Sequence, residues 1–168
     1  TWTGLSIGPA SSDRLVVAVI AQRHGGTATL ADINSCTIGG VSATNVGQSV
    51  GNGGGGGNQA GVYMLTAIVP TGTTATVSVT FNRSMGNAGV MVYTLTDYAT
   101  RVPSGVYTDE NATGNCVLNL SGHGAASCMI GAGCNGNSGR TSVVTTTGAS
   151  SIVENRELVL ESGSSAAV

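Results

Sequence analysis

Short apolar runs alternate along the chain with Gly, Asn and Ser, a pattern typical of β-strands joined by tight turns. Residues 14–21 are almost continuously apolar, which predicts a central strand covered on both faces. Residues 62–69, stopped by Pro70, and residues 89–96 predict two further buried strands.

Two other segments alternate between apolar and polar positions, as half-buried strands do. In residues 74–81, every second side chain is apolar and the others are Thr or Ser. Residues 41–46 show a weaker alternation that predicts one strand, entered from a turn at residues 39–40. Upstream, Asn34 and Ser35 interrupt a strand pattern, which indicates a bulge or a tight turn.

The second half of the chain continues the β pattern. Residues 116–120 and 127–130 predict a hairpin, and residues 141–147 and 156–161 predict later strands. We find no stretch of ten or more residues with a helical apolar period and capping signals. About ten short strands at roughly ten-residue spacing predict an all-β fold, an antiparallel β-sandwich of jelly-roll type.

The whole chain, residues 1–168, reads as a single sandwich domain without an internal linker. The glycine-rich stretch 51–57 predicts a flexible loop, because ordering so many glycines is entropically costly. The end of the chain leaves two alternatives open. Either the sheets are complete after Leu160, or residues 162–168 form an arm that reaches a neighbouring subunit.

The composition narrows the function classes. Charged residues make up only 8% of the 168 positions, with six Arg, no Lys and a net charge of −2, whereas Gly, Thr and Ser account for 66 positions. A nucleic-acid-binding surface needs clustered cations, so we expect none. Lysine-dependent chemistry is excluded. We expect no membrane helix, because no apolar run approaches the required ~18 residues, and the N-terminal residues carry no signal-peptide pattern.

The four cysteines are Cys36, Cys116, Cys128 and Cys134. No two of them form a Cys-x-x-Cys motif, and the chain has only two histidines. We therefore expect no metal site and no cofactor. A disulfide is the favoured interpretation, with Cys116–Cys134 as the preferred pair because the predicted hairpin returns the chain close to itself. Four buried free thiols are the alternative.

No combination of residues makes a convincing catalytic site. His24, Asp97 and Ser138 follow the order of a serine-protease triad, but Asn137 precedes the serine and no histidine motif surrounds His24. Glu157 and Glu161 are predicted about 13 Å apart on one strand, which suits neither glycosidase mechanism. Residues 109–111 supply oxygen ligands but lack the Asp-x-Asp pattern of a Ca²⁺ loop. We therefore expect a protein that is not an enzyme.

Aromatic side chains are scarce, which limits carbohydrate binding. Tyr63 and Tyr93 lie in apolar strands and are predicted to be core residues. Tyr98 and Tyr107 lie in residues 97–114, a long segment where the strand pattern weakens. They form the only candidate ligand platform for stacking against sugar rings.

Three segments together are distinctive: residues 13–19, residues 37–44 with the run Thr-Ile-Gly-Gly-Val, and residues 69–81 with Val-Pro-Thr-Gly-Thr-Thr. They resemble β-sandwich virion structural proteins of tailed bacteriophages, of the capsid decoration, head-fibre or tail-fibre type. The resemblance covers about residues 13–97. It implies a fold and a setting, and it carries no catalytic or ligand-binding residue.

The resulting hypothesis is a non-enzymatic virion structural protein on the surface of a viral particle, outside the cell. Its expected partners are other copies of itself, in a homo-oligomer, and a capsid or fibre protein. A host-surface glycan is a further candidate partner, whereas nucleic acid and membrane are not. The alternative hypothesis is an extracellular carbohydrate-binding β-sandwich module that uses Tyr98, Tyr107 and the glycine-rich loops.

Overall fold

The computed structural model describes residues 1–24, 30–51, 59–98, 100, 108 and 130. These residues form eight β-strands in two four-stranded sheets, and every strand pair is antiparallel. The predicted antiparallel β-sandwich is therefore confirmed. Within the same residues, no helix is long and apolar enough to cross a membrane.

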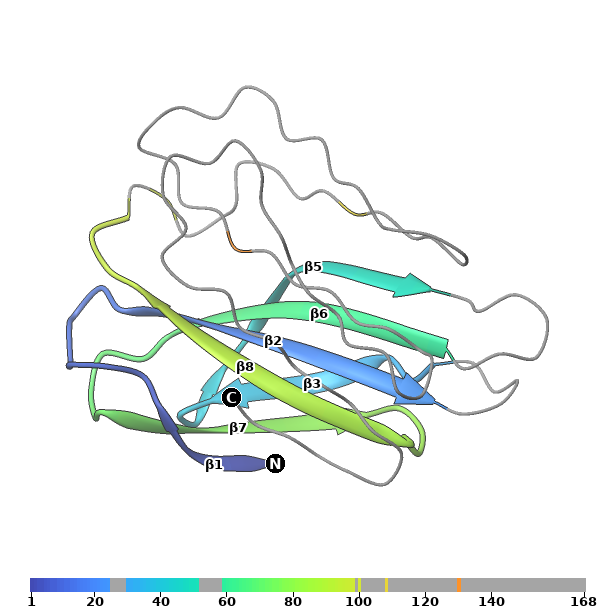
Figure 1. Ribbon diagram of the computed structural model, residues 1–168. Coiled ribbons are helices and arrows are strands. Elements are labelled where there is room, and N and C mark those ends of the chain that lie inside the picture. Colours follow the sequence, from blue (N-terminus) through green and yellow to red (C-terminus); the bar gives the residue numbers. More distant parts are fainter. Residues whose placement is uncertain (25–29, 52–58, 99, 101–107, 109–129, 131–168) are drawn as a thin grey trace.

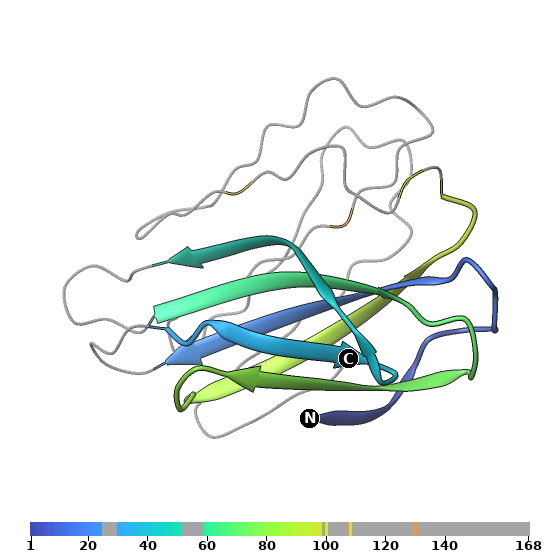
Figure 2. The ribbon, with the colours of Figure 1, turned by 180° about the vertical axis from the view of Figure 1, so that it is seen from behind.

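The two sheets lie one above the other (Figures 1 and 2). The first sheet has the strand order β1-β7-β3-β4 and the second the order β5-β6-β2-β8. Their bounds are β1 Trp2–Ser6, β2 Leu15–His24, β3 Ile33–Ile38, β4 Val41–Ser42, β5 Thr44–Gly51, β6 Gln59–Ile68, β7 Thr74–Phe81 and β8 Asn87–Leu95.

Strand β2 lies at the centre of the second sheet, between β6 and β8. Its even-numbered residues, such as Val16 and Ile20, point into the core between the sheets. Val19, on the opposite face, packs in a second apolar cluster with Met91, and Ile130 contacts that cluster. Both faces of β2 are thus covered, as its unbroken apolar sequence predicts.

Where the structure describes the chain, the core between the sheets is built from aliphatic side chains, Cys36 and the buried Tyr63. Its fully buried members come from both layers and include Val16, Ile20, Ile38, Tyr63, Val77 and Val90. On β7, Ala75 and Val77 are buried and the intervening Thr and Ser residues face outward, which confirms the alternation seen in the sequence.

Residues 41–46 differ from the prediction of one strand. The chain pairs with the first sheet up to Ser42 and with the second sheet from Thr44 onward, so it changes sheets at Ala43. The Ala43 N–H still donates to the Cys36 carbonyl oxygen at 2.9 Å, the last bond to the first sheet. The interruption at Asn34 is a bulge, because the register with β7 shifts between Ile33 and Ser35.

Several predictions fall outside the described residues. These are the hairpin at 116–130 apart from Ile130, the later strands, the tail at 162–168, and most of the loop at 51–57. Gly51 itself is the last residue of β5. The jelly-roll topology depends on the strand order beyond β8, so it stays a prediction.

Candidate functional site

Arg14 makes an extensive set of hydrogen bonds to the backbone. It is fully buried at the entry to β2, and its guanidinium donates to five backbone carbonyl oxygens at 2.6–2.9 Å. These carbonyls belong to two loops, one before β2 and one between β6 and β7: Gly8, Pro9, Val69, Thr71 and Gly72. The planar fork of arginine suits such an array, and it holds both loops together.

A second buried polar group lies at the other end of β2. Gln22 is fully buried, and its Nε2 donates to the Ala31 carbonyl oxygen at 2.6 Å and to the Tyr63 hydroxyl at 3.0 Å. The Tyr63 hydroxyl itself donates to the Ala31 oxygen at 3.1 Å. Gln22 Oε1 is buried without a hydrogen-bond partner. This network fixes the chain before β3 against the core.

Asp13 joins the start of β2 to the chain that leaves β8. Its carboxylate accepts a short hydrogen bond from the Ser11 hydroxyl and one of 3.0 Å from the backbone N–H of Asp97. These two bonds stabilise the ionised form and hold the pKa of Asp13 below its usual value. Asp97 has a φ of 56°, a left-handed conformation that Asp tolerates better than most residues.

The structure separates the residues that the sequence could have combined into a triad. Asp97 contacts Asp13, which lies just before the start of β2. His24 is the last residue of that strand, so it lies at the opposite end. Nine residues of extended chain place the two ends about 30 Å apart. Ser138 lies outside the described residues. Where the structure describes the chain, no three His, Cys, Asp or Glu side chains gather into a group that could hold a metal ion.

Cys36 is a free cysteine buried in the core between the sheets. Burial disfavours its thiolate and raises the pKa of the thiol to about 11. Cys116, Cys128 and Cys134 lie outside the described residues, so the Cys116–Cys134 disulfide stays a prediction.

The tyrosines occupy different environments. Tyr63 is a core residue, as predicted, whereas Tyr93 is only partly buried and packs against the second apolar cluster. Tyr98 is partly buried, and its hydroxyl lies out of contact with solvent and without a hydrogen-bond partner. Tyr107 lies outside the described residues. The ligand platform of Tyr98 and Tyr107 therefore stays a prediction.

The outer surface of the first sheet carries side chains of one chemical kind at most of its positions. Most outward positions on β3, β4 and β7 carry hydroxyl side chains, with the exposed Asn34 in the bulge of β3 as an exception. We call the hydroxyl-bearing positions the hydroxyl face: Ser35, Thr37, Ser42, Thr74, Thr76, Ser78 and Thr80. Sequence reasoning noted the threonines of β7 but not their neighbours, because register between strands distant in sequence is not visible in a pattern.

Pairing between strands places these hydroxyls in rows. Thr37 on β3 lies opposite Ser78 on β7 and opposite Ser42 on β4. Thr1 extends the same row, because its Oγ1 lies 3.1 Å from the Ser78 Oγ. The four strands of this sheet contain no Asp, Glu, Lys, Arg or His. The hydroxyl face is therefore polar and free of charge.

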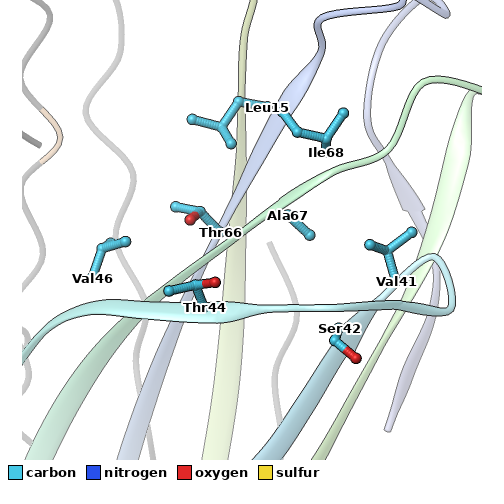
Figure 3. Close-up of a pocket in the computed structure, with 8 residues that line it drawn as sticks. All are labelled: Leu15, Val41, Ser42, Thr44, Val46, Thr66, Ala67 and Ile68. Carbon is cyan, nitrogen blue, oxygen red and sulfur yellow. The ribbon is translucent and has the colours of Figure 1, made fainter. Parts of the chain in front are cut away.

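A hollow of about 330 Å³ lies where the chain crosses between the sheets (Figure 3). Eight residues line it: Leu15, Val41, Ser42, Thr44, Val46, Thr66, Ala67 and Ile68. Five of these are aliphatic and three carry hydroxyls, and Val41 is 41% exposed. The hollow can receive an apolar group, but it offers no acid, base or strong nucleophile.

Comparison with families of known proteins, with characterised proteins and with solved structures gave no match to this chain.

Proposed function

We propose that this chain is a non-enzymatic structural protein that assembles on the surface of a viral particle, as a decoration or fibre-type component. Its partners on this proposal are other copies of itself and a capsid or fibre protein. The resemblance of residues 13–19, 37–44 and 69–81 to virion proteins of tailed bacteriophages suggests the setting.

The observation that carries the proposal is the charge-free surface of the first sheet. Soluble proteins normally cover exposed strand positions with charged side chains, which also discourage association. Here the exposed positions of the four strands carry Ser, Thr or Gly, apart from Asn34 and Val41, and none of them carries a charged side chain. Such a surface loses less hydration energy on contact with another protein than a charged surface does, because no ion has to be desolvated.

The buried polar side chains support a structural role. Arg14, Gln22 and Gln59 all hydrogen-bond to the backbone of neighbouring loops, with the Gln59 Oε1 accepting from Leu30 N–H at 2.8 Å. Each of them holds a loop against the sandwich. A rigid scaffold with fixed loops suits a particle component that must keep its shape outside a cell.

The test is to isolate intact particles from the biological source that encodes the sequence. We expect peptides of this chain to co-migrate with the particles through a density gradient, and antibodies against it to label the outer surface in electron micrographs. Absence of the chain from every particle fraction would overturn the proposal. A reproducible glycan-array signal that Tyr98→Ala or Tyr107→Ala abolishes would favour the carbohydrate-binding alternative instead.

A further inference from the structure

We propose that the outer side of the second sheet is the docking surface for a later segment of the same chain, residues 126–130, which lies on it as part of a third layer. The inference goes beyond the proposed function and does not depend on it. We call this docking surface the outer apolar face. It consists of four buried residues from β2, β6 and β8 and two partly buried ones: Val19, Ala21, Val62 and Met91, with Met64 and Tyr93.

The register of the strands makes the outer apolar face continuous. Val19 on β2 lies opposite Met64 on β6 and opposite Met91 on β8, and Ala21 lies opposite Val62. Neighbours such as Ile20 belong to the core between the sheets, and successive side chains of a strand point to opposite sides. The outer apolar face therefore points away from the first sheet, which cannot bury it.

The burial of this face shows that something else covers it. Val19 is 0% exposed and Met91 is 3% exposed, whereas Thr80 on the outer side of the first sheet is exposed. Ile130, which follows β8 in the chain and lies outside the sheet, packs against the face and is itself half-buried. One isoleucine is too small to cover three strands that lie about 4.8 Å apart, so we infer that its neighbours in sequence share the contact.

The distribution of charge after β8 agrees with this occupant. Residues 115–130 contain no Asp, Glu, Lys or Arg, whereas residues 97–114 and 154–161 contain four charged side chains each. A charge buried against an apolar surface is unfavourable, so the charge-free segment fits the outer apolar face. Chain length is no obstacle. Residues 96–129 join β8 to Ile130 and can extend over about 100 Å, several times the roughly 19 Å width of the sheet.

Alternation along an extended segment identifies the side that docks. Because Ile130 lies on the outer apolar face, Ala126 and Cys128 share its side, and Ala125 and Met129 fall on the opposite side. The docking side then carries Ala, Cys and Ile, all small or aliphatic groups. With the second sheet covered in this way, partners of the chain would meet the first sheet or the loops.

Methyl NMR of the full chain, labelled at Met and Ala, tests the inference. We expect nuclear Overhauser contacts from the Ala126 methyl to Met64 or Met91 and none from the adjacent Ala125, which is the internal control. A soluble paramagnetic agent should broaden Met129 and spare Met91. Equal broadening of Met91 and Met129, or contacts from Ala125 in place of Ala126, would overturn the inference.

Ile130→Asp should detach the segment, because it sets a charge against an apolar surface, and the paramagnetic broadening of Met91 should rise at least about fivefold. Met129→Asp is the matched control, since it adds the same charge on the opposite side and should leave Met91 protected. The Ala75 methyl, buried between the sheets, reports whether each variant stays folded. If Ile130→Asp unfolds the chain, Ile130→Ala replaces it, with an expected rise of about twofold or more.

Two outcomes of these measurements would contradict the docking of residues 126–130. One is a folded Ile130 variant in which Met91 stays as protected as in the original chain. The other is protection of Met91 that disappears on dilution, which would mean that a second copy covers the outer apolar face. Neither outcome bears on the proposed function, which is decided separately by the particle fractions.

Discussion

Arg14 and Val69 hydrogen-bond to each other in both directions. Arg14 Nε donates to the Val69 carbonyl oxygen at 2.7 Å, and the Val69 N–H donates to the Arg14 carbonyl oxygen at 3.1 Å. The two residues lie at neighbouring ends of β2 and β6, whose pairing begins with Leu15 opposite Ile68. Arg14 thereby extends the sheet into the loops that enter and leave it.

Arg14→Met should lower the free energy of unfolding by about 3–5 kcal/mol, because it leaves up to five carbonyl oxygens without their buried donor. Arg14→Lys should be intermediate, since an ammonium has three donors and no planar fork. Urea unfolding followed by fluorescence measures both. Arg83→Met is the control, because Arg83 is exposed, and its effect should stay within about 0.5 kcal/mol. Equal losses for Arg14→Met and Arg83→Met would contradict the prediction.

Gln22→Met should be nearly neutral although Gln22 is fully buried. The substitution removes the unpartnered Oε1, and the Ala31 carbonyl keeps the hydrogen bond from the Tyr63 hydroxyl. Tyr63→Phe should cost about 1 kcal/mol or more, because it removes that donor and the acceptor of Gln22 Nε2. Urea unfolding of both variants compares them directly. A loss above about 2 kcal/mol for Gln22→Met would show that Oε1 has a partner.

Gly39→Ala should destabilise the sandwich more than Gly40→Ala. Both glycines have positive φ, 59° and 81°, so alanine strains the backbone at either position by about 1 kcal/mol. At Gly39 an added Cβ would also lie 2.9 Å from Val69 Cγ1, whereas at Gly40 it would meet nothing within 4 Å. We expect a total loss of about 2–4 kcal/mol for Gly39→Ala. Thermal unfolding of the two variants gives the comparison, and equal losses would exclude the steric contribution.

The strands that could be predicted from the sequence are those whose burial pattern is visible within the strand itself. Strand β2 is apolar on both faces and β7 alternates, and each pattern is complete within the strand itself. Strand β1 was not predicted, because its sequence Trp-Thr-Gly-Leu-Ser contains a left-handed glycine and pairs with β7 only through a register shift. The change of sheets at Ala43 was also missed, since alternation does not tell which sheet a strand joins.

The polar sites were harder to predict than the strands. Arg14 stands at the head of an apolar run, which marks it as unusual, but three of its carbonyl partners lie 55 to 58 residues further along the chain. The hydroxyl face depends in the same way on the register of β3 with β7. Contacts of this kind arise from the tertiary fold, so periodicity in one segment cannot reveal them.

Asp13 should make the stability of the chain sensitive to acid. Hydrogen bonds from Ser11 and from the Asp97 N–H hold its pKa below the ordinary value of 3.8. The stabilisation is therefore fully present above pH 3.8 and is lost as the pH falls through the lower pKa of the folded state. Asp13→Asn should unfold more easily than the original chain near neutral pH, and the difference should vanish in strong acid. Asp97→Asn, which retains the backbone donor, is the control in urea titrations across this pH range. A constant difference between Asp13→Asn and the original chain at every pH would contradict the assignment.

Cys36 should resist alkylation in the folded chain and react readily once the chain is unfolded. It is 5% exposed, and its pKa of about 11 leaves on the order of one thiol in a thousand ionised at pH 8. Trypsin cleaves after Arg23 and Arg83, so the peptide of residues 24–83 contains Cys36 and none of the other cysteines. Mass spectrometry of this peptide after iodoacetamide treatment follows Cys36 alone. We expect labelling at least about 100-fold slower without urea than with it, because reaction then needs the thiol to become accessible as well as ionised. Equal rates in both conditions would mean that the core between the sheets opens readily, contrary to its dense packing around Ile38 and Val77.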